Sequence, residues 1–398
     1  MPEAPASSTR SILITLCATV VLVMAGFGMI APVLPLYART LGMNTFMVGV
    51  LVSSFGLARM LFSLPAGHLS DRFGRRSLIL WGPVILAAAS IGFAFSRGMW
   101  SMIAFRFIQG VGSAFYTTAA NTSLVDVSHQ HNRARVIALY QASLLFGAGL
   151  GPAVGGLVAD LISPQATFLV YAFLSALAAL WAYFTIPETQ PVASHTKAPE
   201  GEAEKTWHLF RDRNFLLVAL VTFAVFFTRS GSRMTVIPLV GSVRLGLDGF
   251  QIGIALSLMS LFNLITLPWS GTAADRHGPK PVIVPSMATI GCALLLFTWS
   301  SGYAFFLVTS VILGIGSGIA GAAPAAYAAE LAPSGRIAST VGLYRTIADA
   351  GWIAGPLLLG MITDQWGYDQ ALLTNAVLLI CSGAFFGLWA TSEPGSRK

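Results

Sequence analysis

The chain has 398 residues, of which 55% are hydrophobic and 10% are charged, and its formal net charge at pH 7 is +7. A soluble domain carries about 25% charged residues, so this composition excludes a water-soluble globular protein. The mean hydropathy of +0.73 points the same way.

Twelve apolar stretches of about 20 to 26 residues follow one another, each long enough to cross a hydrocarbon core of about 30 Å. Backbone polar groups inside lipid must be hydrogen-bonded within the chain, so we expect every stretch to be a helix. The sequence therefore predicts an all-α membrane protein with twelve transmembrane helices. The predicted spans are 13–37, 46–68, 77–96, 99–123, 135–160, 166–187, 214–238, 249–271, 281–300, 303–328, 337–362 and 370–391.

The basic residues indicate the topology. With the N-terminus in the cytoplasm, fifteen of the 23 Lys and Arg residues lie on the inner side and only Arg39, Arg97 and Arg244 lie outside. This asymmetry follows the positive-inside rule, so we expect both termini in the cytoplasm of a protein of the cell membrane. The positive charge thus reports topology, and we expect no nucleic-acid partner. Five arginines lie within spans: Arg59, Arg106, Arg229, Arg233 and Arg345.

When the sequence is shifted by 204 residues, glycines, prolines and charged residues of the first half align with like residues of the second half. Parallel repeats of this size are typical of transporters whose site lies between two helical bundles. The stretch 188–213, rich in Pro, Glu and Lys, divides the chain into a six-helix bundle over 1–187, a cytoplasmic linker over 188–213 and a six-helix bundle over 214–398. The residues paired by the shift include Gly42 and Gly246, Gly49 and Gly253, Asp71 and Asp275, Asp126 and Glu330, Pro152 and Pro356, and Asp160 and Asp364.

Sequence signatures of enzymes are missing. The chain has no HExxH, Walker or GxSxG motif, and its three cysteines lie far apart within apolar spans. A scattered, odd set of cysteines argues against a metal cluster. We therefore expect no catalysis, no metal and no cofactor.

The segment 67–76, GHLSDRFGRR, joins the second and third spans. Gly67 and Gly74 allow a tight turn, and Asp71 suits the N-terminal end of a helix. The segment resembles the loop signature of the major facilitator superfamily, which implies that Asp71 faces the eleventh span and stabilises the outward-open state. We expect Asp126 to pair with Arg75, and Glu330 with Lys280 of the second copy. The candidate gating residues are Gly67, Asp71, Arg72, Gly74, Arg75, Asp126, Asp275, Arg276 and Glu330.

Two further motifs lie in the spans 99–123 and 135–160. Arg106 and Gln109 resemble the fourth-helix motif of proton-coupled exporters of this superfamily, which implies a role in proton transfer. A structural Arg106 that bonds a neighbouring backbone is the alternative. Glycines at four-residue spacing let helices pack at backbone distance, and a proline kinks a helix. The second motif resembles the antiporter motif of the twelve-helix drug/proton antiporter group and consists of Gly147, Gly151, Pro152, Gly155 and Gly156.

Asp349 is the one acid deep in a span, and Arg345 precedes it by one helical turn. It is either the proton carrier or part of a permanent ion pair with Arg345 or Arg229. Many exporters of this group have an acid in the first span, and this chain has none there. The five buried arginines would favour anionic substrates, but some of them have structural explanations.

We therefore expect a secondary transporter that exports small amphiphilic or drug-like compounds in exchange for protons by alternating access. Its partners would be the substrate, protons and membrane lipid, and we expect a monomer. An exporter of organic anions or metabolites and a non-transporting membrane sensor are the alternatives. The candidate residues for coupling and binding are Arg106, Gln109, Arg229, Arg345 and Asp349.

Overall fold

A computed structural model describes residues 6–128, 132–188, 211–321, 323–332 and 337–391. Across these ranges every regular element is a helix and no strand occurs. Eleven of these helices are long and apolar enough to span a membrane. The remaining predicted span, 99–123, corresponds to a 29-residue helix that carries the polar side chains of Arg106, Gln109 and Asn121. The predicted all-α transmembrane fold is confirmed, and most of the linker predicted over 188–213 lies outside the described residues.

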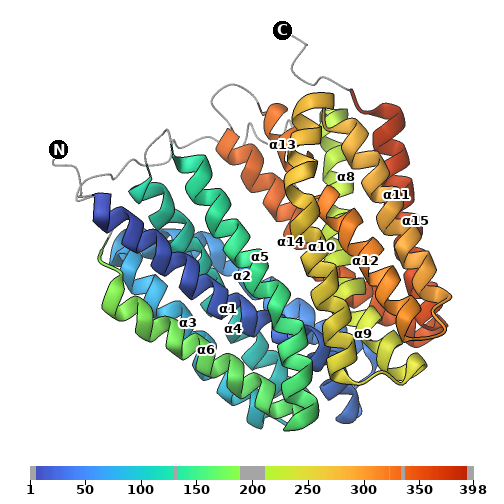
Figure 1. The fold of residues 1–398 in the computed structure, drawn as a ribbon, viewed down its shortest axis with the longest axis horizontal. Coiled ribbons are helices and arrows are strands. Elements are labelled where there is room, and N and C mark those ends of the chain that lie inside the picture. The colour runs from blue at the N-terminus through green and yellow to red at the C-terminus, as the bar shows by residue number, and fades with distance from the viewer. Residues whose placement is uncertain (1–5, 129–131, 189–210, 322, 333–336, 392–398) are drawn as a thin grey trace. The chain divides into compact units, whose positions relative to one another are not determined.

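The helices follow the predicted spans closely (Figure 1). Those of the first half are α1 (Ala6–Thr40), α2 (Thr45–Phe73), α3 (Arg75–Phe95), α4 (Met99–Val127), α5 (Arg133–Leu161) and α6 (Pro164–Thr185). Those of the second half are α8 (Arg213–Phe227), η2 (Thr228–Val236), α9 (Ile237–Leu239), η3 (Val240–Arg244), α10 (Gly249–His277), α11 (Lys280–Thr298), α12 (Tyr303–Ile319), α13 (Ala323–Glu330), α14 (Ile337–Trp366) and α15 (Tyr368–Trp389).

Two details differ from the predicted spans. The span predicted over 214–238 is one continuous rod in which η2 and η3 are π-helical. The span predicted over 303–328 is interrupted after Ile319, where α12 ends, and resumes at Ala323 as α13.

The structure divides into two compact units. Unit 1 comprises Met1–Met43, Val50–Ser194 and Asp248–Ser257. Unit 2 comprises Asn44–Gly49, His195–Leu247 and Leu258–Lys398. Two helices are consequently shared: α2 begins in unit 2 and continues in unit 1, whereas α10 begins in unit 1 and continues in unit 2.

The sequence repeat is also a repeat of backbone conformation. Gly42 and Gly246, which precede α2 and α10, have φ angles of 79° and 65°. Gly74 and Gly278, which follow those helices, have φ angles of 87° and 82°. Only glycine adopts this left-handed region without strain. The same turns therefore bound the same helices in both halves.

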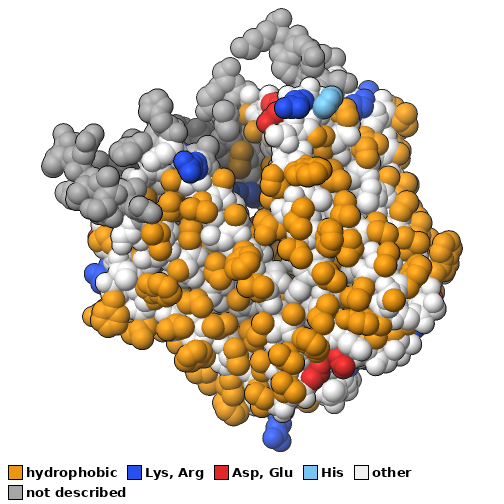
Figure 2. Space-filling model, viewed as in Figure 1, with side chains coloured by type: hydrophobic (Ala, Val, Ile, Leu, Met, Phe, Trp, Pro, Cys, Tyr) orange, Lys and Arg blue, Asp and Glu red, His pale blue; other side chains and the backbone are white. Residues whose placement is uncertain are grey.

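The outer surface of the helices is apolar. Figure 2 shows hydrophobic side chains over the flanks of the visible helices, with most of the coloured charged side chains at helix ends. Large residues such as Trp100, Trp269 and Leu388 are exposed on this surface. Such a surface is suited to lipid rather than to water.

Candidate functional site

The loop between α2 and α3 turns at a single glycine. Gly74 has the left-handed φ angle of 87°. Gly67 lies inside α2, which continues to Phe73. The prediction that Gly67 helps to form the turn is therefore wrong, because α2 extends further into the loop than hydropathy indicates.

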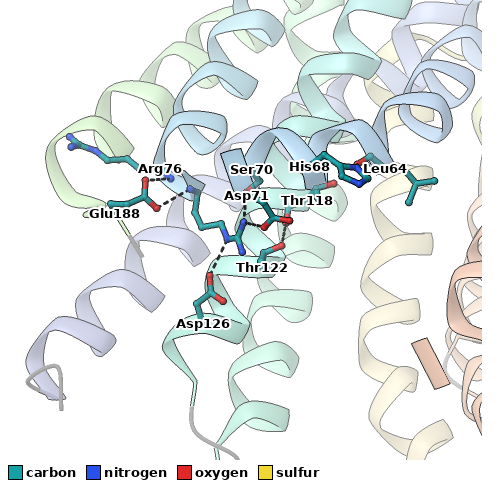
Figure 3. Close-up of polar contacts among 10 residues, drawn as sticks. Leu64, His68, Ser70, Asp71, Arg76, Thr118, Thr122, Asp126 and Glu188 are labelled. Carbon is teal, nitrogen blue, oxygen red and sulfur yellow. Dashed lines mark hydrogen bonds and ion pairs between the residues drawn. The ribbon is translucent and has the colours of Figure 1, made fainter. Parts of the chain in front are cut away.

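Figure 3 shows Ser70 and Asp71 of α2 and Asp126 of α4. Arg75, at the start of α3, connects these two helices. Its Nε donates to Asp126 Oδ2 at 3.1 Å, and its Nη1 donates to Ser70 Oγ at 3.3 Å and to an Asp71 carboxylate oxygen. The Arg75 side chain is largely buried, as is that of Asp126. The structure thus contains the expected Arg75–Asp126 pair. A buried guanidinium between two carboxylates fixes the end of α2 against α4.

The N-terminus of α3 is capped from a distant segment. Glu188, which follows α6, accepts hydrogen bonds from the backbone N–H groups of Arg75 at 2.9 Å and Arg76 at 3.3 Å (Figure 3). Asp71, by contrast, lies in the last turns of α2 and pairs with the Arg75 side chain. The Glu188 carboxylate stabilises α3 because it bonds free amides at the helix N-terminus and interacts favourably with the helix dipole. Sequence reasoning missed Glu188, although an acid directly after a span was visible.

The second copy of the loop is built differently. Lys280 Nζ donates to the carbonyl oxygen of Ala390 at 2.9 Å, just after α15. In the described part of the chain it does not pair with Glu330, so that expected ion pair is wrong. The physical reason is register: the shift of 204 residues aligns Lys280 with Arg76, and Pro279 with Arg75. Asp275 and Arg276 are exposed at the end of α10.

Arg106 and Gln109 meet in a buried polar network of unit 1. Arg106 Nη1 donates to Gln109 Oε1 at 2.8 Å, and Gln109 Nε2 donates to Ser90 Oγ of α3 at 2.9 Å. Arg106 Nε also donates to the Leu51 carbonyl oxygen at 3.4 Å, and its guanidinium lies 4.9 Å from the Phe55 ring centroid. Among the described residues no carboxylate pairs with it. Neutral dipoles and an aromatic face therefore stabilise this charge.

In unit 2 the rod that begins as α8 becomes π-helical where its arginines lie. Arg229 and Arg233 are both in η2. Asn375 of α15 holds this segment, because its Oδ1 accepts from Thr228 Oγ1 at 3.0 Å and its Nδ2 donates to Ser232 Oγ at 2.6 Å. π-helical turns are rare and occur frequently at functional sites.

Helix α14 carries Arg345 and Asp349 one turn apart, the former exposed and the latter half-buried. It packs closely against α8 and η2: a Cβ added at Gly351 would lie 2.5 Å from the Phe223 carbonyl oxygen, and one at Gly355 would lie 2.3 Å from that of Phe227. The structure therefore brings the helix of Asp349 next to the helix of Arg229.

The glycine motif of α5 packs mainly on α1. A Cβ added at Gly147 would lie 2.6 Å from the Val21 carbonyl oxygen, and one at Gly151 would lie 2.3 Å from that of Ala25. At Gly155 the nearest atom is the Met29 carbonyl oxygen at 2.3 Å, so no side chain fits on this face. Gly156 faces α10 instead, where an added Cβ would lie 2.0 Å from the Gly249 carbonyl oxygen.

Known proteins are similar to this chain over nearly its whole length. An uncharacterized MFS-type transporter of Methanocaldococcus jannaschii is 24% identical over 90% of this chain and 93% of its own. Multidrug resistance protein 2 of Bacillus subtilis is 22% identical over 94% of both chains. The solved structure of the nucleoside transporter NupG (D323A mutant) covers 95% of this chain and 100% of its own, with a TM-score of 0.80 and 16% identity.

A comparison with models of protein families also covers nearly the whole chain. The model of the Major Facilitator Superfamily matches the chain twice, over residues 16–250 and over residues 223–398. Between them the matches include both loop copies, the α4 network and both glycine-lined helices. The chain is a multi-pass membrane transporter that belongs to the Major Facilitator Superfamily.

Proposed function

We propose that this transporter exports small amphiphilic or drug-like compounds in exchange for protons by alternating access. The proposal of export rests on the glycine face of α5. A Cβ added at Gly147, Gly151 or Gly155 would lie within 2.6 Å of an α1 carbonyl oxygen. This face contains the motif that resembles the antiporter motif of exporters. Similarity to a multidrug resistance protein supports the same substrate class.

Proton coupling is assigned to the charged residues within the two units. Asp349 is the proton carrier in this proposal, because it is half-buried at mid-helix on α14 and has arginines on its own and on the neighbouring helix. Arg106 and Gln109 would hold a fixed positive charge in unit 1, and Arg229 and Arg345 would bind and orient the substrate.

A second candidate function is export of organic anions or metabolites. It is favoured by the positive charge of the spans, where Arg229 and Arg233 lie within η2 and Arg106 is only 3% exposed. Buried positive charge of this kind favours carboxylates over lipophilic cations as substrates. A non-transporting sensor would need none of these residues.

We place the protein in the cell membrane as a monomer with both termini in the cytoplasm. The gating roles of Arg72, Arg75, Asp126, Asp275, Arg276 and Glu330 remain part of the proposal. In this scheme the Arg75 network stabilises one transport state and is rearranged in the other. Transport, rather than catalysis, is the activity to measure.

The test is a proton-flux assay in everted membrane vesicles whose lumen has been acidified. Cationic, neutral and anionic compounds are added in turn, and a fluorescent dye reports the pH gradient. Proton antiport requires that a compound dissipate the gradient only in vesicles containing the protein. The Asp349→Asn variant, present at the same membrane level, should lose this response. An unchanged response in that variant rejects Asp349 as the carrier, and a response to carboxylates alone selects anion export.

A further inference from the structure

Asp160, near the end of α5, caps the start of α10. Its carboxylate accepts hydrogen bonds from the backbone N–H groups of Gly249 at 3.2 Å and Phe250 at 2.6 Å. The next N–H of α10, from Gln251, goes to the local cap Asp248 at 2.7 Å. A helix begins with unsatisfied N–H groups, and here a carboxylate from another helix satisfies two of them.

Asp364, near the end of α14, caps the start of α2 in the same way. It accepts from the backbone N–H groups of Thr45 and Phe46, both at 2.8 Å. The next N–H, from Met47, goes to the local cap Asn44 at 2.9 Å. The shift of 204 residues relates every member of this arrangement to its counterpart in the first, so the structure contains the same device twice.

The helices meet closely enough beside each carboxylate for this contact. A Cβ added at Gly156 would lie 2.0 Å from the Gly249 carbonyl oxygen, and one at Gly360 would lie 2.7 Å from that of Thr45. With no side chain between the backbones, a short aspartate reaches the first turn of the opposite helix. This explains why glycine occurs four residues before each of these aspartates.

Each cap lies wholly inside one compact unit, but the helix that it caps does not. Residues Asp248–Ser257 of the α10 region belong with α5 in unit 1, and the remainder of α10 belongs to unit 2. Residues Asn44–Gly49 belong with α14 in unit 2, and the remainder of α2 belongs to unit 1. When one unit moves against the other, α2 and α10 must bend at these boundaries or their capped first turns must detach.

We propose that Asp160 and Asp364 are positioning residues of the transport cycle, a pair of releasable helix caps that hold the first turns of α10 and α2 in one transport state and release them in the other. The proposal rests on alternating access in the proposed function. Both aspartates are exposed at helix ends, so the carboxylates and amides can be hydrated when they separate. Loss of one cap should shift the ratio of the two states by about 2-fold to 30-fold.

The experiment uses the full-length protein in membranes, with Cys17, Cys292 and Cys381 replaced by serine and one reporter cysteine introduced. Ser257 is suited to this, because its Oγ accepts a hydrogen bond from Ala153 N at 3.0 Å. Ser257 is half-buried, so the Ser257→Cys thiol should be alkylated by a maleimide faster when α10 separates from α5. Asp160→Asn, which keeps the size but removes the charge, should raise the alkylation rate about 2-fold to 30-fold, and Asp160→Ala at least as much.

Asp248→Asn is the matched control, because it removes the same charge from the cap of the same helix without touching α5. The alkylation rate of Ser257→Cys should be the same with and without Asp248→Asn. Ser53, the counterpart of Ser257 under the shift of 204 residues, is buried in α2. The reciprocal pair, Ser53→Cys with Asp364→Asn, should respond alike. An unchanged rate in both Asp160 variants, or an equal rise in Asp248→Asn, overturns the proposal. Alkylation needs neither substrate nor a proton gradient, so failure of proton antiport in vesicles leaves this result independent.

Discussion

The two copies of the loop keep a cation at one position and differ at another, where Arg75 of the first copy corresponds to Pro279 of the second. Arg76 Nη2 donates to the Tyr183 carbonyl oxygen at 2.9 Å at the end of α6. Its counterpart Lys280 donates to the Ala390 carbonyl oxygen at 2.9 Å after α15. Both fasten the first turn of a helix to the end of the last helix in their half. Arg75, with its two carboxylates, has only Pro279 as counterpart.

The glycine faces of α5 and α14 show the same mixture of retained and changed positions. Gly147 and Gly151 correspond to Gly351 and Gly355, and all four lie at backbone distance from a neighbouring helix. Gly155 corresponds to Leu359, which is fully buried. Close packing is therefore present at two corresponding glycines of α5 and α14, and at a third glycine, Gly155, in α5 alone.

The largest effect is expected from Gly155→Ala, which removes this third glycine. The added Cβ would lie 2.3 Å from the Met29 carbonyl oxygen and would force α1 and α5 apart. Overpacking of this kind costs about 1–3 kcal/mol, and we expect the upper part of that range. The thermal midpoint in detergent should fall by several degrees. The control Gly67→Ala, whose Cβ meets nothing within 4 Å, should hold or raise the midpoint.

Arg75→Met comes next and tests whether the first loop copy is the gating one. It leaves Asp126 and Asp71 without their shared cation, at a cost of about 2 kcal/mol. We expect transport to fall at least tenfold while the protein still reaches the membrane. Lys280→Met in the second copy should leave transport within about threefold, because one hydrogen bond to a carbonyl oxygen contributes about 1 kcal/mol. Equal losses in the two variants would contradict the asymmetry.

Glu188→Gln should have a smaller effect confined to the cap of α3. The amide still accepts one backbone hydrogen bond, but the favourable interaction of the charge with the helix dipole is lost, at about 0.5–1 kcal/mol. Hydrogen exchange of the first α3 amides should accelerate correspondingly. A change spread over α4 as well would show that Glu188 acts through the Arg75 network instead.

Pro279→Arg is expected to have the smallest effect. It tests whether the second loop copy can form the ion pairs that Arg75 makes in the first. It places an arginine between Asp275 and Glu330 of the second copy, in the position that Arg75 occupies in the first. Both acids are exposed, so a new ion pair would add at most about 1 kcal/mol. The thermal midpoint should rise slightly, and this gain should disappear when Glu330→Gln is added.

The sequence predicts the number, order and type of the helices, because the length of a lipid-spanning helix and its composition are local properties. It also predicts the repeat and the Arg75–Asp126 pair. It misses the π-helical form of η2, a segment that Asn375 bonds at Thr228 and Ser232 from more than 140 residues away. It misses Glu188 as the cap of α3 for the same reason. The predicted Glu330–Lys280 pair is wrong because Lys280 corresponds in register to Arg76 rather than to Arg75.

The sharing of α2 and α10 between the units has a consequence for biosynthesis. Unit 1 includes residues up to Ser257, and unit 2 includes residues as early as Asn44. During synthesis, unit 1 therefore remains incomplete until well after residues 188–213 have left the ribosome, and unit 2 needs a segment made near the beginning. Cutting the chain within residues 188–213 would give two fragments, each holding a piece of the other unit. Co-expression, rather than either fragment alone, should then yield a stable protein.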